Sequence, residues 1–590
     1  MRGLIAASVA ALVLSGLPPA LPAELPAQPV SRAAPEDPDT VCRPFIEGFR
    51  SDYGDIATTG LRIPQGAAPP PPPPPPMVAP AAPPPITSQE QSASGGIRSQ
   101  GVVGAAPRYI PSPDNRERYA GEEVAQVQAV ADAPVSTFGI DVDTGSYANV
   151  RRMLTRGEMP PQAAVRTEEM LNYFRYDYPR PQDRSRPFSI TTDMTTTPWN
   201  ANTRLLRVGL RGYDLPREGR PPANLVFLID VSGSMGEPDK LPLVQCSLAL
   251  LANRLQRQDR VAIVVYAGAA GLVLPSTSRR EDVVEAIKRL QAGGSTAGAA
   301  GIQLAYQQAR ANRIEGGINR VILATDGDFN VGVTNNDALV DMVEREREAG
   351  ITLTTLGFGT GNYNEAMMEQ IADHGNGNYA YIDSPREAQK VLDQELASTL
   401  FTIAHDVKIQ VEFNPAYVSE YRLIGYENRL LAEQDFDNDA VDAGDIGAGH
   451  QVTALYEIVP AGSRGWLPQR RYPDNRREAG GVGNDELAFL RLRYKLPGEQ
   501  ESRLIEQPVA AGLIRSARAP AGDTAFVAAV AAYGQLLRGD SNLGGFGFGD
   551  VRRLAERARA DDYWRREFVQ LTELAERQRF AGGKGEAGRD

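Results

Sequence analysis

The sequence predicts an α/β fold with a doubly wound, mostly parallel sheet, inserted in a flanking β-sandwich with N- and C-terminal helical segments. Three observations lead to this prediction. Apolar runs typical of buried parallel strands alternate with amphipathic helical patterns over residues 223–400. Strand patterns with a period of two precede this region from residue 188 and return over 405–496. Helical spacing of apolar residues marks both outer ends, over 119–185 and 501–580.

The central region begins with a continuous apolar run, Leu225–Ile229, as expected of a strand that is covered on both faces. A helix is predicted from about Lys240, with Pro242 in its first turn. Further strands are predicted at 261–265, 320–324, 351–356 and 379–382, with a short edge strand at 272–274. Further helices are predicted at 282–290, 301–311, 337–349, 365–372 and 385–400.

The flanking regions supply the second layer of the prediction. Strands are expected at 189–192 and 205–210 before the α/β unit, and at 407–411, 452–458 and 487–494 after it. We expect these two sets to meet in one β-sandwich from which the α/β unit projects. Helices are expected at 147–156, 163–176 and 523–537, and at 550–579 with a break near Asp561.

The predicted organisation of the 590 residues follows from these patterns. It comprises a signal peptide (1–23), a disordered Pro-rich spacer (24–118), an N-terminal helical module (119–185), a β segment (186–222), the α/β domain (223–400), a β-rich domain (401–500), a C-terminal helical region (501–580) and a disordered tail (581–590). Eight consecutive prolines, Pro69–Pro76, favour polyproline II in the spacer.

The net charge and the predicted cellular location of the protein restrict the class of partner that it can bind. The net charge of −12 argues against nucleic acid and against an anionic membrane surface. The apolar run 4–17 follows a basic start and predicts export to the periplasm or cell envelope, with an uncleaved anchor as the alternative membrane contact. Cys42, in a polar segment, is expected to be free or paired with another chain. Cys246 is expected to pack in a helix, and the two are not expected to pair.

Three short segments carry the chemistry. The first buried strand ends in Asp230-Val-Ser232-Gly-Ser234, Thr296 follows a glycine pair, and Asp326 follows another buried strand. Carboxyl ends of parallel strands are where open α/β sheets place ligands. All five side chains are hard oxygen donors, which suit Mg²⁺, with Mn²⁺ or Ca²⁺ as alternatives, and one coordination position is left for an outside carboxylate. The alternative is that these residues only cap a helix and close a turn.

This set of residues resembles the metal-ion-dependent adhesion site of von Willebrand factor type A domains, whose fold is Rossmann-like. The resemblance covers about residues 223–400 and implies that Ser232, Ser234 and Thr296 contact a metal, while Asp230 and Asp326 bind it directly or through water. The segments 136–146 and 323–332 and the C-terminal region resemble an exported bacterial subfamily, often labelled calcium-activated chloride channel homologues. No channel activity is expected, because the sequence lacks a pore-forming segment.

The resemblance implies a non-enzymatic, exported module in which Mg²⁺ binds an acidic residue of a partner protein. The first alternative is a structural scaffold of the cell envelope with a vestigial or stabilising metal site, and the second is a hydrolase. The segment Asp143-Thr-Gly-Ser146 imitates an aspartic protease motif, but it occurs once and precedes a predicted helix. The acidic run 435–439 lacks the Gly and Glu of an EF-hand loop and is expected to be a solvated loop.

Overall fold

The computed structural model describes most of the chain beyond its N-terminal region. The described residues are 37–52, 117–182, 186–215, 219–294, 298–327, 336–361, 363–395, 398, 400–468, 485–558 and 562–586. The predicted signal peptide, the proline run and Thr296 lie outside them. Within these residues, no helix combines the length and the apolar character needed to cross a membrane.

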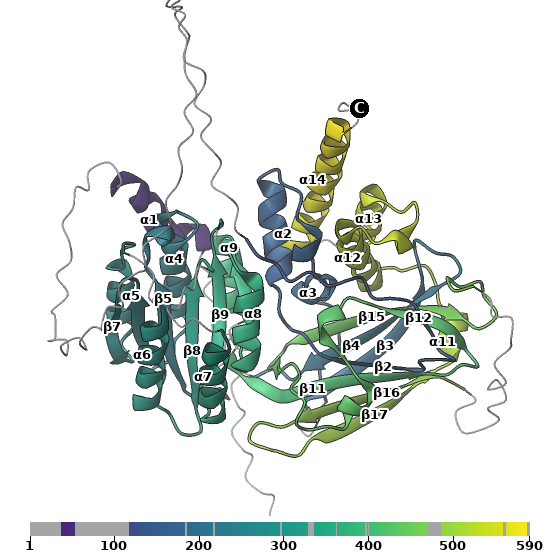
Figure 1. Cartoon of the computed structure of the whole chain (residues 1–590), viewed down its shortest axis with the longest axis horizontal. Helices are drawn as coiled ribbons and strands as arrows, with labels where there is room; N and C mark the ends of the chain where they lie inside the picture. Colours follow the sequence, from purple (N-terminus) through teal and green to yellow (C-terminus); the bar gives the residue numbers. More distant parts are fainter. Residues whose placement is uncertain are drawn as a thin grey trace, which may run out of the picture. The chain divides into compact units, whose positions relative to one another are not determined.

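The α/β domain is built on a six-stranded sheet (Figure 1). Its strands are β5 (Ala223–Asp230), β6 (Arg260–Tyr266), β7 (Ala270–Thr277), β8 (Ile318–Thr325), β9 (Thr352–Phe358) and β10 (Tyr379–Ile382). They lie in the order β10-β9-β8-β5-β6-β7, and every pair is parallel except β6 with the edge strand β7. This arrangement confirms the predicted mostly parallel sheet and the edge position of the strand expected at 272–274, although β7 is longer than predicted.

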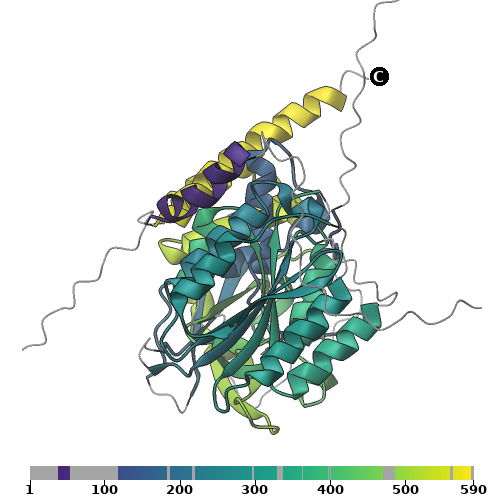
Figure 2. The same ribbon diagram turned by 90° about the vertical axis from the view of Figure 1, so that its left-hand side faces the viewer.

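Helices cover both faces of this sheet, as Figure 2 shows. They are α4 (Leu241–Ala252), α5 (Arg280–Lys288), α6 (Gly298–Ala311), α7 (Asn336–Glu348), α8 (Glu365–His374) and α9 (Pro385–Gln389), the last continued by a π-helical turn, η4 (Lys390–Gln394). Alternate side chains of β5 enter two separate cores. Phe227 packs with residues of α4 and α5, whereas Leu228 packs with residues of α6, α7 and α8. The continuous apolar run of β5 therefore reflects burial on both faces.

Strands from before and after the α/β domain form two antiparallel sheets, which confirms the predicted sandwich. One sheet has the order β1 (Gln128–Ala129), β12 (Val418–Ile424), β15 (Gln451–Pro460), β4 (Arg204–Gly212), β3 (Phe188–Thr196). The other has the order β13 (Leu430–Leu431), β2 (Val135–Gly139), β11 (Thr402–Phe413), β16 (Glu486–Lys495), β17 (Arg503–Ala510), and β14 (Ile446–Gly447) pairs with β11. β4 pairs with β15 from Arg204–Ile458 to Arg211–Gln451. The Phe413 ring of one sheet stacks on Tyr421 of the other, with centroids 4.5 Å apart.

The helices outside the α/β domain share a core of their own. They are α2 (Gly145–Thr155), α3 (Thr167–Tyr173), α12 (Asp523–Arg538), α13 (Phe548–Ala555) and α14 (Tyr563–Glu586). Phe174 packs edge-on against Phe526 and Phe568, which joins N- and C-terminal segments in one aromatic cluster. The predicted break near Asp561 is confirmed, because α13 ends at Ala555 and α14 begins at Tyr563.

Several boundaries differ from those expected. The segment 119–185, predicted as helical, also contributes β2 to the sandwich, and the region from 501 begins with strand β17. Helix α14 continues to Glu586, into the segment predicted as a disordered tail. Strand pairing decided the first two differences, because a short apolar run has no fixed conformation until a neighbouring strand accepts its hydrogen bonds.

Two expectations were wrong: that the whole N-terminal spacer is disordered, and that the two cysteines do not pair. Helix α1 (Pro38–Asp52) lies inside the segment predicted to be disordered, and it packs on α4 and α9. Cys42 of α1 forms a disulfide with Cys246 of α4, with their Cα atoms 4.8 Å apart. Their separation of 204 positions in the sequence does not prevent pairing, because the entropic cost of closing a loop grows only slowly with its length.

Candidate metal centre

Four of the five predicted site residues lie at one edge of the parallel sheet. Asp230 is the last residue of β5, Ser232 and Ser234 follow it, and Asp326 follows β8, the strand beside β5. Asp230 and Asp326 are fully buried, and Ser232 is buried. Thr296 lies outside the described residues.

The glycine pair that precedes Thr296 reaches the same place. The backbone N–H of Gly293 donates to the carbonyl of Val231 at 2.8 Å, and that of Gly233 donates to the carbonyl of Gly294 at 3.1 Å. These two bonds attach the glycine loop to the loop that carries Ser232 and Ser234. Main-chain hydrogen bonds therefore join two loops that are about sixty residues apart in the sequence. No side chain takes part in these bonds.

The carboxylate of Asp230 is held by three donors. Its Oδ1 accepts the Ser232 backbone N–H at 2.8 Å, and its Oδ2 accepts the hydroxyls of Tyr266 and Thr325, each at 3.1 Å. Burial raises the pKa of Asp230 to about 6, the Ser232 and Thr325 hydrogen bonds lower it, and the Asp326 charge adds to the rise. A bound cation would favour the ionised form of this carboxyl.

The hydroxyl geometry suits a small divalent ion. The Oγ atoms of Ser232 and Ser234 lie 3.0 Å apart. Two oxygens in adjacent octahedral positions around Mg²⁺, each about 2.1 Å from the ion, are separated by about 3.0 Å. The donor set of two hydroxyls and buried carboxylates therefore fits a hard cation, and Ser232, Ser234, Asp230 and Asp326 are the described residues that would hold it.

The sequence did not predict that the ammonium group of Lys240 lies at the candidate metal centre. The Nζ of Lys240, the residue that caps the N-terminus of α4, lies 2.8 Å from Oδ2 of Asp326, and both side chains are buried. Sequence reasoning also missed Tyr266 and Thr325 as donors to Asp230. No local pattern in the sequence links Lys240 to Asp326, which lies 86 residues further along the chain.

The turn after Asp326 depends on a glycine. Gly327 has φ +88°, and a Cβ there would overlap the backbone of Tyr363 and Asn364. The left-handed conformation and the close approach both favour glycine at this position. Of two further acidic residues near these loops in the sequence, Glu237 is exposed and Asp328 lies outside the described residues.

A second acidic cluster lies where three parts of the chain meet. Carboxylate oxygens of Asp141, Asp143 and Glu369 all lie within 4.8 Å of one another. The guanidinium of Arg429 ion-pairs with all three, at 3.5, 3.8 and 3.1 Å, and with Asp373 at 2.6 Å. An arginine therefore supplies positive charge to this cluster, which we call the ionic joint.

The motif that imitates an aspartic protease belongs to this joint. Asp143 Oδ1 accepts the backbone N–H of Tyr379 at 2.9 Å, and Asp141 Oδ1 accepts that of Asp143 at 2.8 Å. A helix follows this motif, as predicted, although α2 begins at Gly145, two residues before the expected start at Tyr147. Both aspartates therefore have structural partners.

The histidines also have structural partners. The imidazole of His374 bonds with Glu344, that of His405 with Asp445, and that of His450 with the Gly447 N–H. Burial lowers the pKa of His450 to about 3, so this ring stays neutral. None of these bonds involves Ser232 or Ser234, so they give no support to the hydrolase alternative.

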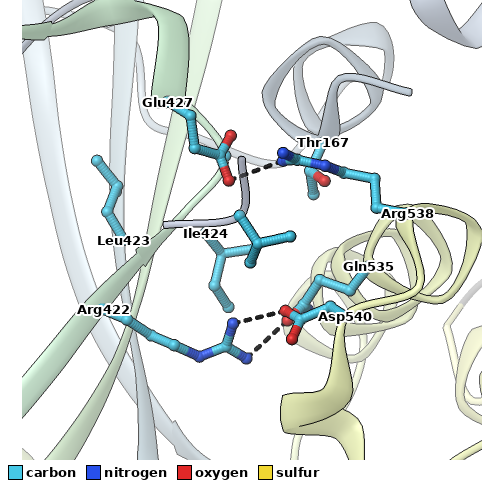
Figure 3. A pocket seen from close by; sticks show the side chains of 10 residues that line it. Thr167, Arg422, Leu423, Ile424, Glu427, Gln535, Arg538 and Asp540 are labelled. Carbon is cyan, nitrogen blue, oxygen red and sulfur yellow. Dashed lines mark hydrogen bonds and ion pairs between the residues drawn. The ribbon is translucent and has the colours of Figure 1, made fainter. Parts of the chain in front are cut away.

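A hollow between β12 and α12 is too small for an organic ligand. Figure 3 shows its lining, in which Arg422 pairs with Asp540 and Gln535, and Arg538 pairs with Glu427. Its free volume is about 10 Å³. That volume accommodates about one water molecule.

Comparison with known proteins assigns the family. The model "von Willebrand factor type A domain" matches residues 224–394, "von Willebrand factor" matches 113–207, and "Uncharacterized protein YfbK, C-terminal" matches 398–578. YfbK of Escherichia coli (strain K12) is 47% identical over 482 residues, which cover 80% of this chain and 83% of that protein. The chain belongs to the YfbK family. The predicted resemblance is thus confirmed, together with the C-terminal domain of this family.

More distant relatives match this chain at lower identity. The human inter-alpha-trypsin inhibitor heavy chain H3 is 28% identical over 273 residues, which cover 42% of this YfbK-family chain and 30% of the human protein. A solved structure described as von Willebrand factor type A from Catenulispora acidiphila is 17% identical and covers 65% of this chain and 88% of its own, with a TM-score of 0.36. Domains of the von Willebrand factor A type are generally protein-interaction modules.

Proposed function

We propose that this protein is an exported binding module that holds a partner protein through a divalent cation. The observation that carries the proposal is the buried oxygen-donor set at one sheet edge, with the Ser232 and Ser234 hydroxyls 3.0 Å apart beside the fully buried Asp230. When bound, Mg²⁺ would supply a Lewis-acidic coordination position for a carboxylate of the partner. The neutral hydroxyls would leave most of the charge of the ion available to that carboxylate.

The residues of the chain would prepare the site before the ion binds. Tyr266 and Thr325 hold the Asp230 carboxylate from one side, and the Ser232 N–H holds it from the other. Because these donors come from neighbouring strands and their connecting loop, the site is rigid on its sheet side. An interaction module of the von Willebrand factor A type with such a site suits a protein ligand that presents an exposed Asp or Glu.

Export is supported by the only two cysteines of the chain, which are joined in the Cys42–Cys246 disulfide. Structural disulfides persist in oxidising compartments such as the bacterial periplasm and are rare in the cytosol. The apolar run 4–17 points to the same compartment.

Calorimetric titration of the full chain with Mg²⁺ tests the metal site. We expect wild type to bind one Mg²⁺ per chain and Asp230→Ala to lose at least about tenfold in affinity, because the substitution removes a buried carboxylate from the donor set. Asp341→Ala is the matched control, since Asp341 is an exposed aspartate on α7 of the same domain. Equal affinities for wild type and Asp230→Ala would contradict the proposal.

A pull-down from the periplasmic fraction tests the use of that site. A partner that binds wild type, and is lost both with chelator and with Asp230→Ala, supports ion-mediated binding. A partner retained equally under all three conditions supports the alternative, a structural scaffold of the cell envelope whose metal site is vestigial or only stabilises the fold. Recovery of the protein solely from the cytosolic fraction would contradict export.

A further inference from the structure

We infer that Lys240 is a built-in counter-cation of the metal centre and sets its affinity for divalent ions. The inference rests on the proposed metal site. Lys240 Nζ lies 2.8 Å from Asp326 Oδ2, in direct contact with one of the two carboxylates expected to hold the ion. The ammonium and the ion would therefore draw on the same negative charge.

The position of Lys240 is enforced by its surroundings. Its side chain is only 6% exposed and Asp326 is fully buried, so water screens their interaction weakly. The backbone N–H of Lys240 donates to the carbonyl of Glu237 at 3.0 Å, and its own carbonyl accepts the N–H of Val244 at 2.9 Å. Both ends of the residue are thus held by the loop and by the first turn of α4.

The stem of Lys240 also depends on a glycine across the site. Gly359, which follows β9, has φ +68°, and a Cβ at this position would overlap the Cγ, Cδ and Cε atoms of Lys240. The missing side chain at 359 therefore leaves the channel through which the lysine reaches Asp326. Contacts from α4, the turn after β8 and the turn after β9 together direct the ammonium to the metal centre.

This arrangement has two opposite effects on the site. Without metal, the ammonium neutralises a buried carboxylate that would otherwise be costly to keep ionised. With metal, the same positive charge repels the ion and shares Asp326 with it. The domain can therefore remain folded without the ion, at the expense of weaker metal binding, and occupancy becomes sensitive to the ambient Mg²⁺ concentration.

Mg²⁺ titration of the full chain by calorimetry tests the inference with Lys240→Met and Lys240→Gln. Both substitutions remove the charge, and the glutamine keeps a hydrogen-bond donor for Asp326. We expect each to bind Mg²⁺ roughly tenfold more tightly than wild type, because the competing cation is gone. Lys240→Arg, which keeps the charge, should stay near the wild-type affinity.

The matched control is Lys390→Met. Lys390 is also a buried lysine of the α/β domain, and its Nζ pairs with Glu395 at 3.2 Å instead of with a site residue. Its removal should leave Mg²⁺ affinity unchanged. If loss of Lys240 weakens folding without metal, Mg²⁺ should raise the melting temperature of Lys240→Gln more than that of wild type.

The outcomes separate this inference from the metal site itself. If wild type binds no Mg²⁺, or binds it as tightly as Asp230→Ala does, the proposed metal site fails. If wild type binds Mg²⁺ and Asp230→Ala does not, but Lys240→Gln binds with unchanged or lower affinity, only the role of Lys240 is overturned. Lower affinity would mean that Lys240 positions Asp326 instead of competing for it.

Discussion

Glu365, the first residue of α8, is a carboxyl group placed where water cannot reach it. Its side chain is fully buried beside the ionic joint. Burial raises the pKa of Glu365 to about 8, and the charge of Glu369 adds to the rise, while Arg166, Arg152 and a hydrogen bond with Asn149 lower it. At neutral pH this group is therefore mostly protonated, and it packs as a neutral acid among tyrosines and arginines.

The raised pKa of Glu365 makes stability depend on pH. In the unfolded chain the group ionises near 4.5, and in the folded chain near 8. Its contribution to stability is complete below about 4.5, falls as the pH rises towards 8, and stays low above that value. We expect Glu365→Gln to raise the free energy of unfolding by about 1 kcal/mol or less at pH 5, and by roughly 3–5 kcal/mol at pH 9.

Urea unfolding at the two pH values measures the effect of Glu365→Gln. Glu348→Gln is the control, because Glu348 is an exposed glutamate at the end of α7. An equal effect of Glu365→Gln at both pH values would show that the carboxyl does not titrate with a raised pKa.

Among the elements, α1 depends most on a single covalent bond. It is a 15-residue helix with Pro44 in its interior, and a proline there removes a helical hydrogen bond. Cys42 is fully buried against α4, and Asp39 ion-pairs with Arg386 of α9 at 3.6 Å. The disulfide and these contacts, more than the helix propensity of the segment, keep α1 in place.

Removal of the disulfide should release α1 and leave the rest of the fold intact. We expect Cys42→Ser, or reduction of wild type, to cost about 2–4 kcal/mol of stability and to accelerate amide hydrogen exchange in α1 by at least tenfold. Exchange in α12, whose apolar residues are almost all buried, is the internal control. Unchanged protection of α1 after reduction would mean that packing on α4 suffices.

Across the whole molecule, buried arginines connect the α/β domain to its flanking segments. Arg151 of α2 donates to Asp383 at 2.7 Å and ion-pairs with Glu387 of α9 at 2.7 Å and with Glu567 of α14 at 3.0 Å. Arg429, between β12 and β13, makes the corresponding joint to α8. Because each arginine forms ion pairs with carboxylates from separate parts of the chain, these parts should unfold together.

Loss of one of these buried arginines should weaken the coupling between the parts of the chain during thermal unfolding. Arg151→Met leaves three carboxylates without their shared cation, and we expect it to cost about 3–5 kcal/mol. In scanning calorimetry, the single transition of wild type should broaden or split in this variant. Arg156→Met is the control from the end of the same helix, since the Arg156 pair with Asp239 is largely exposed and should contribute less than about 1 kcal/mol. A single, equally sharp transition in Arg151→Met would indicate that apolar packing alone couples the domains.

Local sequence determined much of this structure. The apolar run of β5, the helical spacing of α4 and the turn residues between them predicted the α/β unit, because burial on two faces and helical periodicity are properties of neighbouring residues. The candidate site was predictable for the same reason: Asp230, Ser232 and Ser234 lie within five residues, at the end of a recognisable strand. Its metal-binding role stays a prediction.

Only the tertiary structure decided which distant residues meet. The contacts of Lys240 with Asp326, of Cys42 with Cys246, and of Arg429 with carboxylates from two other segments carry no periodic signal in the sequence. The pairing partners of β2 and β17 were equally hidden, since a strand specifies which of its faces is apolar but not which edge it will join. Short-range patterns follow from burial and backbone geometry, whereas the long-range ion pairs, the disulfide and the strand order depend on how the completed elements pack.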